Sequence, residues 1–302
     1  MSLDKISPAP FEIDVGSVVI RGLVAGTAER GLLIALHGGG YDANYWHTSD
    51  SDAGSLMNIG AALGFKVVAV DRPGYRGSNL ADPMGLSVSG QAEIMFKLIE
   101  QLDLDPGLPV FLIGHSLGGI LALVMASHQK GRRLAAIDVS GVPLRFPSEM
   151  EAGIASLLSL LRSKTPPPLP TNADRANHRR AIFYGADDHF DPALVKDSGD
   201  HPTPLNELED AFNAPVALPP TIAQIAIPIQ WTIADQEKSS IGGKEMIAEI
   251  RDYMTSCPML RTEIQVASGH NISLHHVARA YHLRAFAFFE EILALNPKRM
   301  GD

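Results

Sequence analysis

The 302-residue sequence has little of several features, and each shortage excludes a class of protein. Its single cysteine, Cys257, cannot form an internal disulfide and gives no thiolate metal cluster. No run of about 18 consecutive apolar residues occurs, so we expect no membrane span. The first ten residues contain an acidic residue and two prolines where a secretory signal peptide would have its apolar segment. We therefore expect a soluble, cytoplasmic protein.

Positive charge is also scarce, because 25 Lys and Arg residues stand against 34 Asp and Glu residues, giving a formal net charge of −9. A nucleic-acid-binding surface needs clustered basic residues, and no basic stripe is present, so we expect no nucleic-acid partner. With 45% hydrophobic and 20% charged residues, the chain has the composition of a globular protein that buries a substantial core.

Short apolar runs alternate with helix-like patterns along most of the chain. Two runs at 11–15 and 17–24, joined at Gly16, are typical of an antiparallel pair at a sheet edge. Nearly continuous apolar runs that alternate with helices indicate a mostly parallel sheet with helices on both faces, here with eight strands. The remaining expected strands are 32–36, 65–70, 110–113, 134–139, 229–233 and 263–266, and the expected helices are 55–63, 89–102, 117–128, 244–254 and 275–295.

The alternation is interrupted once. From residue 143 to residue 224 the pattern is irregular, with one helical stretch at 149–161 followed by proline-rich and acidic pieces. A connection of this length is usually functional. We therefore expect residues 1–142 and 225–302 to form the α/β core, and residues 143–224 to form an inserted lid.

The motif G-H-S-L-G-G at 114–119 carries the chemistry. It follows an apolar run and precedes an Ala/Leu-rich helix, so Ser116 lies on a strand-to-helix turn. Flanking glycines leave room for a backbone that presents the serine hydroxyl above the sheet, and the amides that begin the helix favour a developing anion. Ser116 is the predicted nucleophile.

A second glycine-rich loop, H-G-G-G at 37–40, ends the expected strand 32–36. Loops at the carboxyl ends of parallel strands gather at one edge of the sheet, so this loop should lie beside Ser116. We expect the amides of Gly39 and Leu117, with Gly40 as a further candidate, to hold the oxygen of a tetrahedral intermediate. His37 is expected to be a structural hydrogen-bonding residue.

Candidate substrate contacts flank these motifs: Tyr41 and Trp46 after the glycine loop, and His115 beside the serine. Trp46 is also typical of a core residue. The helical stretch at 149–161 carries an apolar stripe that includes Ile154 and Leu157, and this stripe either roofs an apolar pocket or packs the lid onto its own domain.

Three motifs in this order resemble those of the α/β-hydrolase-fold serine hydrolases: the H-G-G loop, the turn D-R-P-G-Y-R-G-S at 71–78, and the serine turn. Arg76 stands where the family often has a glycine in its structural turn. The resemblance covers about residues 11–142 and 225–295. Triple-glycine loops also occur in hormone-sensitive-lipase-like esterases, but His115 and Leu117 differ from that branch, so no subfamily is assigned.

The resemblance implies a histidine after the last strand and an acid after strand seven. His270, in V-A-S-G-H-N, holds the place of the family's histidine, and Asp235 the place of its acid, with Glu237 as a nearby competitor. The segment 183–191 resembles the same acid signature through Asp187. We favour Asp235, because its strand leads directly into one helix and the histidine strand.

These residues predict a serine hydrolase that cleaves an ester or thioester of a small organic acid through an acyl-enzyme, without metal or organic cofactor. Asp187, Asp188, His189 and Asp191 are more typical of a solvated loop than of a metal site. Alternatives on the same triad are C–C bond hydrolysis, lactone opening or acyl transfer, and a ligand-binding protein without catalysis is a further alternative. The expected partner is a small-molecule acyl substrate. The sequence does not decide the oligomeric state, and a homodimer is one alternative.

Overall fold

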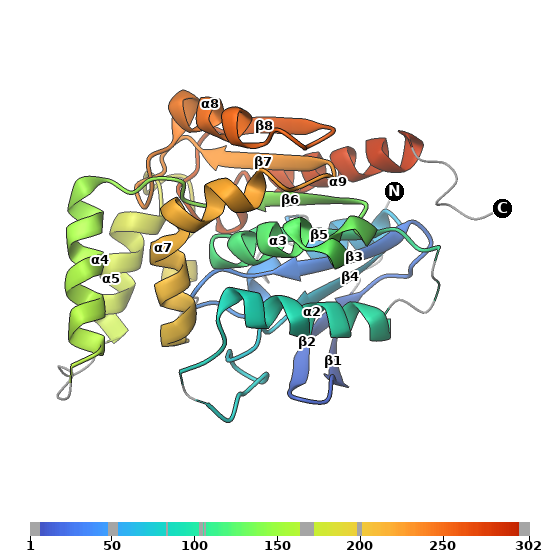
Figure 1. The fold of residues 1–302 in the computed structure, drawn as a ribbon, viewed down its shortest axis with the longest axis horizontal. Coiled ribbons are helices and arrows are strands. Elements are labelled where there is room, and N and C mark those ends of the chain that lie inside the picture. Colours follow the sequence, from blue (N-terminus) through green and yellow to red (C-terminus); the bar gives the residue numbers. More distant parts are fainter. Residues whose placement is uncertain are drawn as a thin grey trace.

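A computed structural model describes residues 7–47, 54–82, 84–102, 105, 107–163, 172–197 and 201–295 (Figure 1). Its centre is an eight-stranded sheet of order β1-β2-β4-β3-β5-β6-β7-β8. β2 pairs antiparallel with β1 and with β4, and all other neighbours are parallel. The strands are Ala9–Asp14, Val19–Ala25, Gly31–Leu36, Phe65–Val70, Val110–His115, Ala136–Ser140, Ile229–Ala234 and Leu260–Gln265, for β1 to β8. The predicted mostly parallel sheet and its antiparallel edge pair are confirmed.

Helices cover both faces of the sheet, which explains why β3 and β5 are buried along their whole length. The buried side chains of α2, α3, α7 and α8 pack on one face, and those of α1 and α9 pack on the other. These helices are Leu56–Ala62 (α1), Val88–Leu102 (α2), Leu117–Ser127 (α3), Leu205–Ile222 (α7), Gly243–Tyr253 (α8) and Ala278–Leu295 (α9). In the described ranges, no helix combines the length and the apolarity that crossing a bilayer requires.

Between β6 and β7 the chain leaves the sheet and forms α4 (Ser148–Leu161), α5 (Asn172–Phe183), α6 (Pro192–Asp197) and α7. In Figure 1, α4 and α5 stand beyond the carboxyl ends of the strands, and α7 leads back toward α3. We refer to α4–α7 as the inserted helices. The sequence pattern predicted helix only at 149–161, so this segment is more regular than expected.

Helix α7 contains three prolines, at positions 215, 219 and 220, which favoured an irregular interpretation of this stretch. The helix nevertheless buries Ala214, Leu218 and Ile222, which lie four residues apart on one stripe and join the cluster that includes α3. This burial outweighs a propensity cost of about 3 kcal/mol for a proline in a helix interior. The second half of α7 therefore covers the sheet, although the sequence assigned it to the lid.

A buried ion pair ties the inserted helices to the sheet. Arg72, which follows β4, donates through Nη1 to the carboxylate of Glu207 on α7, and both side chains are fully buried. The same guanidinium donates through Nε to the carbonyl of His37 over 2.7 Å. Because an unpaired charge in the interior is costly, the pair holds α7 against the glycine loop that follows β3.

Candidate active site

Ser116 lies at the junction of β5 and α3 in a strained backbone conformation, with φ 53° and ψ −118°. A positive φ is uncommon for a residue other than glycine and persists only where its surroundings enforce it. Here the Ser116 amide donates to the carbonyl of Ser140 on β6 over 2.8 Å, and its own carbonyl accepts from Ile120 in α3 over 2.9 Å. The serine is therefore held at the carboxyl edge of the sheet.

Close backbone contacts explain the glycines around the serine. A Cβ atom added to Gly114 would lie 2.4 Å from the carbonyl oxygen of Gly118, and one added to Gly118 would lie 2.2 Å from the carbonyl oxygen of Leu36. Both contacts are with backbone, which cannot swing away as the end of a side chain can. The strand-to-helix turn predicted from the motif thus has the tight geometry that presents Ser116.

The glycine loop 37–40 lies against this turn, because β3 and β5 are parallel neighbours that pair Leu36 with Gly114. A Cβ atom added to Gly39 would lie 2.7 Å from Cδ1 of Leu117, so the two predicted oxyanion amides belong to adjoining segments. Gly39 lines the cavity at Ser116. Gly40, the further candidate for the oxyanion, has φ 79°, and its carbonyl accepts from the amide of His201, which precedes α7.

His37 has the structural role expected for it. Its Nδ1 donates to the Gly38 carbonyl over 2.7 Å, and its Nε2 accepts from the Arg72 amide over 3.1 Å. Burial, with the nearby Arg72 charge, lowers the pKa of His37 well below its usual value, so the ring is neutral and can accept that bond. These contacts stabilise the loop that presents Gly39.

His270 follows β8 and contacts a carboxylate, but this carboxylate belongs to Glu237. The Nδ1 atom of His270 lies 2.8 Å from Oε2 of Glu237, with side-chain exposures of 6% and 3%. Burial raises the pKa of the Glu237 carboxyl, yet the His270 charge and the hydrogen bonds from His270 and Ser239 outweigh burial and leave the pKa lowered. Glu237 is therefore an ionised partner that orients the imidazole.

The expectation that Asp235 pairs with His270 is wrong for this contact. Both oxygens of the Asp235 carboxylate accept backbone amides, from Ala267 and from Ser268, each over 3.1 Å. Asp235 is the first residue after β7, and its side chain reaches the neighbouring loop that leaves β8. Ala267 has φ 57°, so Asp235 stabilises the unusual turn that leads to His270. Glu237, two residues further and one methylene longer, reaches the ring.

The alternative acid, Asp187, is also away from His270. Its carboxylate pairs with Arg180 over 2.6 Å at the surface, where the aspartate side chain is 72% exposed. Phe183 ends helix α5 and is not followed by a strand, so the segment 183–191 is not strand seven. Its actual role is packing: the Phe183 ring lies 5.0 Å from the His270 ring, centroid to centroid.

Ser239 was missed by sequence reasoning. Its hydroxyl donates to Oε1 of Glu237 over 2.6 Å and lies 2.9 Å from Nδ1 of His270, while its amide donates to the same carboxylate oxygen over 2.8 Å. Ser239 therefore holds the carboxylate that holds the imidazole. No local pattern marks it, since its place in the site depends on how the loop after β7 folds back over Glu237.

A hydrogen-bonded network lies beneath the histidine. Asn271 donates through Nδ2 to the hydroxyl of Tyr41 over 2.7 Å, which leaves its Oδ1 to accept from Nε2 of His115 over 3.0 Å. Nδ1 of His115 then accepts from the Ser140 hydroxyl over 3.2 Å. Burial, followed by the nearby charge of His270, lowers the pKa of His115 well below its usual value, so this ring is neutral. The neighbours of the serine and of the histidine are thus bonded to each other.

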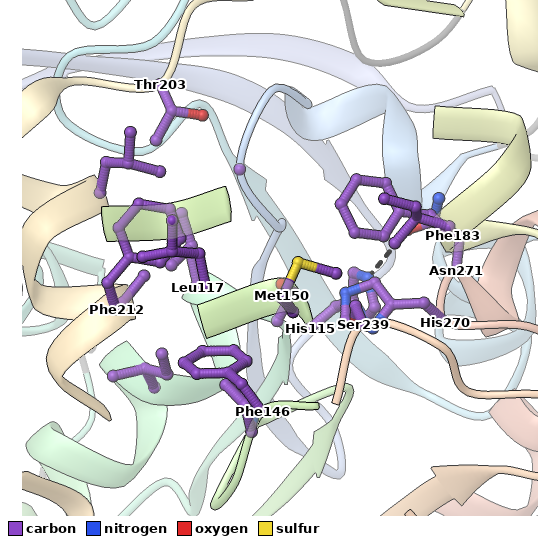
Figure 2. A pocket seen from close by; sticks show the side chains of 18 of the residues that line it. His115, Leu117, Phe146, Met150, Phe183, Thr203, Phe212, Ser239, His270 and Asn271 are labelled. Atoms are coloured by element: carbon purple, nitrogen blue, oxygen red, sulfur yellow. Dashed lines mark hydrogen bonds between the residues drawn. The ribbon is translucent and has the colours of Figure 1, made fainter. Parts of the chain in front are cut away.

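Ser116, His270 and Ser239 line one cavity of about 210 Å³ beneath the inserted helices. Figure 2 shows His270, Ser239 and Asn271 together on one side of it and Phe212 on the other. Of the predicted substrate contacts, Tyr41 and His115 line the cavity. Trp46 does not, because it is 1% exposed in the core, edge-on to Tyr45 at 4.9 Å. Its assignment as a substrate contact is wrong.

Among the described residues, no group of three or more His, Cys, Asp or Glu side chains is arranged to hold a metal ion. Of the two roles that the sequence left open for the apolar stripe of α4, Ile154 has the first, because it lines the cavity. Leu157, by contrast, is 42% exposed on the outer side of the helix.

A mostly parallel, doubly covered sheet whose carboxyl edge carries a serine turn, a glycine loop and a buried histidine–carboxylate pair has the arrangement of an α/β-hydrolase fold. The sequence matches the alpha/beta hydrolase family over residues 33–283, and the chain belongs to this family. Its membership supports a hydrolase as the class of enzyme.

The sequence identity between this chain and individual similar proteins is low. The protein phosphatase methylesterase 1 of Pongo abelii is 29% identical over 141 residues, which are 46% of this chain and 34% of that protein. The 2-hydroxy-6-oxononadienedioate/2-hydroxy-6-oxononatrienedioate hydrolase 1 of Pseudomonas putida is 29% identical over 94 residues, 31% of this chain and 30% of that protein. The chain covers about a third of the length of these curated relatives. A solved esterase from Exiguobacterium antarcticum, with TM-score 0.68 and 15% identity over 90% of this chain and 96% of that one, shares the fold.

Proposed function

We propose that this protein is a serine hydrolase that cleaves an ester or thioester of a small organic acid through an acyl-enzyme. The observation that carries the proposal is the buried contact of 2.8 Å between His270 and Glu237, at a cavity that Ser116 also lines. A carboxylate bonded to Nδ1 keeps a proton on that nitrogen and leaves Nε2 free to accept one.

The chemistry uses three side chains. His270 removes the proton of the Ser116 hydroxyl as its oxygen bonds to the substrate carbonyl carbon, and Glu237 stabilises the imidazolium that forms. The amides of Leu117 and Gly39 hold the oxyanion. The intermediate then collapses, the alcohol or thiol leaves with the proton from His270, and the acyl group stays on Ser116.

Water completes the cycle. His270 takes a proton from water as the water oxygen bonds to the acyl carbon, and the second intermediate releases the organic acid while Ser116 recovers its proton. Each amide donor at the oxyanion contributes on the order of 10²–10³ to the rate. The esterase and methylesterase relatives support this reaction class, and the Pseudomonas hydrolase is the basis for testing C–C bond cleavage as the alternative.

A fluorophosphonate probe tests the nucleophile. We expect it to label the wild-type protein on Ser116, as located by mass spectrometry, and to leave Ser116→Ala unlabelled. Ser239→Ala is the matched control, because this second serine lines the same cavity and we expect its variant to be labelled. Label on Ser239, or equal labelling of Ser116→Ala, would reject the assignment. Release of acid from esters, thioesters and β-diketones then identifies the reaction.

A further inference from the structure

The cavity at Ser116 has two chemically different ends. One end carries the polar groups described above. The other end is formed by apolar side chains from α3 and the inserted helices, including Ile120, Met150, Ile154, Ile182, Leu208 and Phe212. Figure 2 shows Phe146 and Phe212 at this end and Met150 projecting into the space. An acyl group attached to Ser116 can occupy this apolar end, because the apolar end begins at α3, the helix that directly follows Ser116.

No Lys, Arg, Asp or Glu is among the described residues that line the cavity. Besides the polar groups at the catalytic end, the lining includes the side chains of His178 and Thr203. Two ion pairs lie outside the lining. Arg72 and Glu207 pair with each other behind the glycine loop, fully buried. Arg180 on α5 pairs with Asp187 at the surface. A carboxylate at the far end of a bound acyl chain would therefore meet mostly apolar side chains and no lysine or arginine of the lining.

From this lining we infer the substrate class: the site takes acyl groups that are uncharged and apolar, and it discriminates against acyl chains that end in a carboxylate. The inference rests on the proposed function. Burial of apolar acyl surface is favourable in proportion to its area, whereas a carboxylate loses its water shell without gaining a lysine or arginine partner from the lining. The side chains at the apolar end, referred to below as the apolar wall, therefore discriminate against a carboxylate through the cost of removing its water shell.

This substrate class differs from that of the Pseudomonas putida relative, whose name describes dioates, which carry two carboxylates. A dioate in this cavity would bury one of its charges among the side chains of α4 and α7. The inference thus favours the ester and thioester chemistry of the proposed function over cleavage of acidic diketone-like substrates.

Three esters with one leaving group test the inference: p-nitrophenyl hexanoate, mono-p-nitrophenyl adipate, and the methyl ester of the latter. The first two differ only in a terminal methyl or carboxylate, and the third restores neutrality at greater length. We expect kcat/KM for hexanoate to exceed that for adipate by at least about 100-fold, with most of the loss recovered by the neutral methyl ester. Repeating the assay at 0.5 M salt separates the wall from the net charge of −9, because screening weakens long-range repulsion and leaves desolvation unchanged.

A charge placed in the wall should alter the preference. Met150, in the first turn of α4, lines the cavity and has an unbranched side chain, so Met150→Arg can direct a guanidinium toward the acyl end. We expect the ratio of hexanoate to adipate to fall at least about tenfold. Leu157→Arg is the matched control: it adds the same charge to the same helix at a position that is 42% exposed, and the ratio should stay at the wild-type value.

The outcomes distinguish the two proposals. If wild-type protein hydrolyses hexanoate and adipate equally, or prefers adipate, the inference is overturned while the proposed function stands. If the discrimination disappears in high salt, or if both arginine variants change the ratio equally, the apolar wall is not its cause. If no ester is hydrolysed and the fluorophosphonate does not label Ser116, the proposed function itself fails.

Discussion

The two halves of the candidate site are held by different kinds of force. The half that carries Ser116 is fixed by close backbone contacts. A Cβ atom on Gly114 would clash with the Gly118 carbonyl oxygen at 2.4 Å, and one on Gly118 with the carbonyl oxygen of Leu36 on the neighbouring strand β3 at 2.2 Å. The half that carries His270 is fixed by side-chain hydrogen bonds between the loops after β7 and β8. Steric clashes restrict a turn to one backbone conformation, whereas a hydrogen-bonding group can be satisfied by any of several partners within reach.

This difference explains which residues could be assigned in advance. A turn that excludes every side chain at two positions is visible as two glycines in the sequence. A carboxylate that must reach an imidazole more than thirty residues away leaves a choice between neighbours, and Asp235 and Glu237 are both present. Four substitutions test this difference, and the one with the strongest predicted consequence is given first.

Removing the charge of Glu237 is the strongest test of the hydrogen-bonded half. We expect Glu237→Gln to lower kcat by about 10³–10⁴-fold, because an amide in place of the carboxylate favours the wrong imidazole tautomer. Asp235→Asn is the matched control. It should lower kcat less than tenfold and reduce the free energy of unfolding by about 1 kcal/mol, since Asp235 contacts backbone amides of the loop. Steady-state kinetics of the two variants check this, and a larger loss in Asp235→Asn would restore Asp235 as the acid.

Gly118→Ala tests the steric half. Its Cβ would lie 2.2 Å from the Leu36 carbonyl oxygen, and we expect the free energy of unfolding to fall by about 3 kcal/mol or more. Gly153, in the interior of α4, has no atom within 4 Å of an added Cβ, so Gly153→Ala should stabilise the protein by about 0.5–1 kcal/mol. Urea denaturation measures both changes. A stable Gly118→Ala variant would show that the turn is not sterically fixed.

Asp138 lies on β6, the strand between the two halves. Burial raises its pKa to about 7, despite hydrogen bonds from Tyr281 and Gln230 that lower it. The unfolded carboxyl has a pKa of about 3.9, so the contribution of the protonated form to stability is complete below about pH 4 and is lost as the pH rises to about 7.

Asp138→Asn should remove this pH dependence, because the amide still accepts the Tyr281 hydrogen bond and does not ionise. Oε1 of Gln230, which has no partner among the described residues, can accept from the new amide after rotation. From pH 5 to pH 8, the free energy of unfolding of the variant should gain about 2 kcal/mol on that of the wild type. Equal differences in urea denaturation at both pH values would contradict the shift.

The smallest expected effect concerns Ser239. We expect Ser239→Ala to lower kcat by about tenfold with KM unchanged, because Glu237 loses one hydrogen bond but keeps those from His270 and from the backbone. Ser239→Thr retains a hydroxyl and should recover most of the rate. Ser273→Ala removes a hydroxyl bonded to a different histidine, His282, and should leave kcat at the wild-type value. Equal kcat in the alanine and wild-type proteins would show that the backbone amide alone positions Glu237.

Much of the fold and half of the site follow from local sequence. The apolar runs predicted the strands, and β4 begins and ends at the residues expected for it. The serine turn and the glycine loop were predicted because each directly follows an apolar run, and His270 because it holds the place of the histidine in the family that the sequence resembles. Helix α7 was less predictable, because Pro215, Pro219 and Pro220 disfavour a helix that its contacts with α3 and the rest of the core stabilise.

The amino-acid sequence was enough to place the strands of the sheet and the serine turn, because apolar periodicity and the glycines around Ser116 are patterns of neighbouring residues. The folded chain was needed to show that Glu237 rather than Asp235 faces His270, that Ser239 supports Glu237, and that Arg72 and Glu207 pair in the interior. These choices depend on the distance and direction between side chains far apart in sequence. Such geometry exists only after the chain has folded.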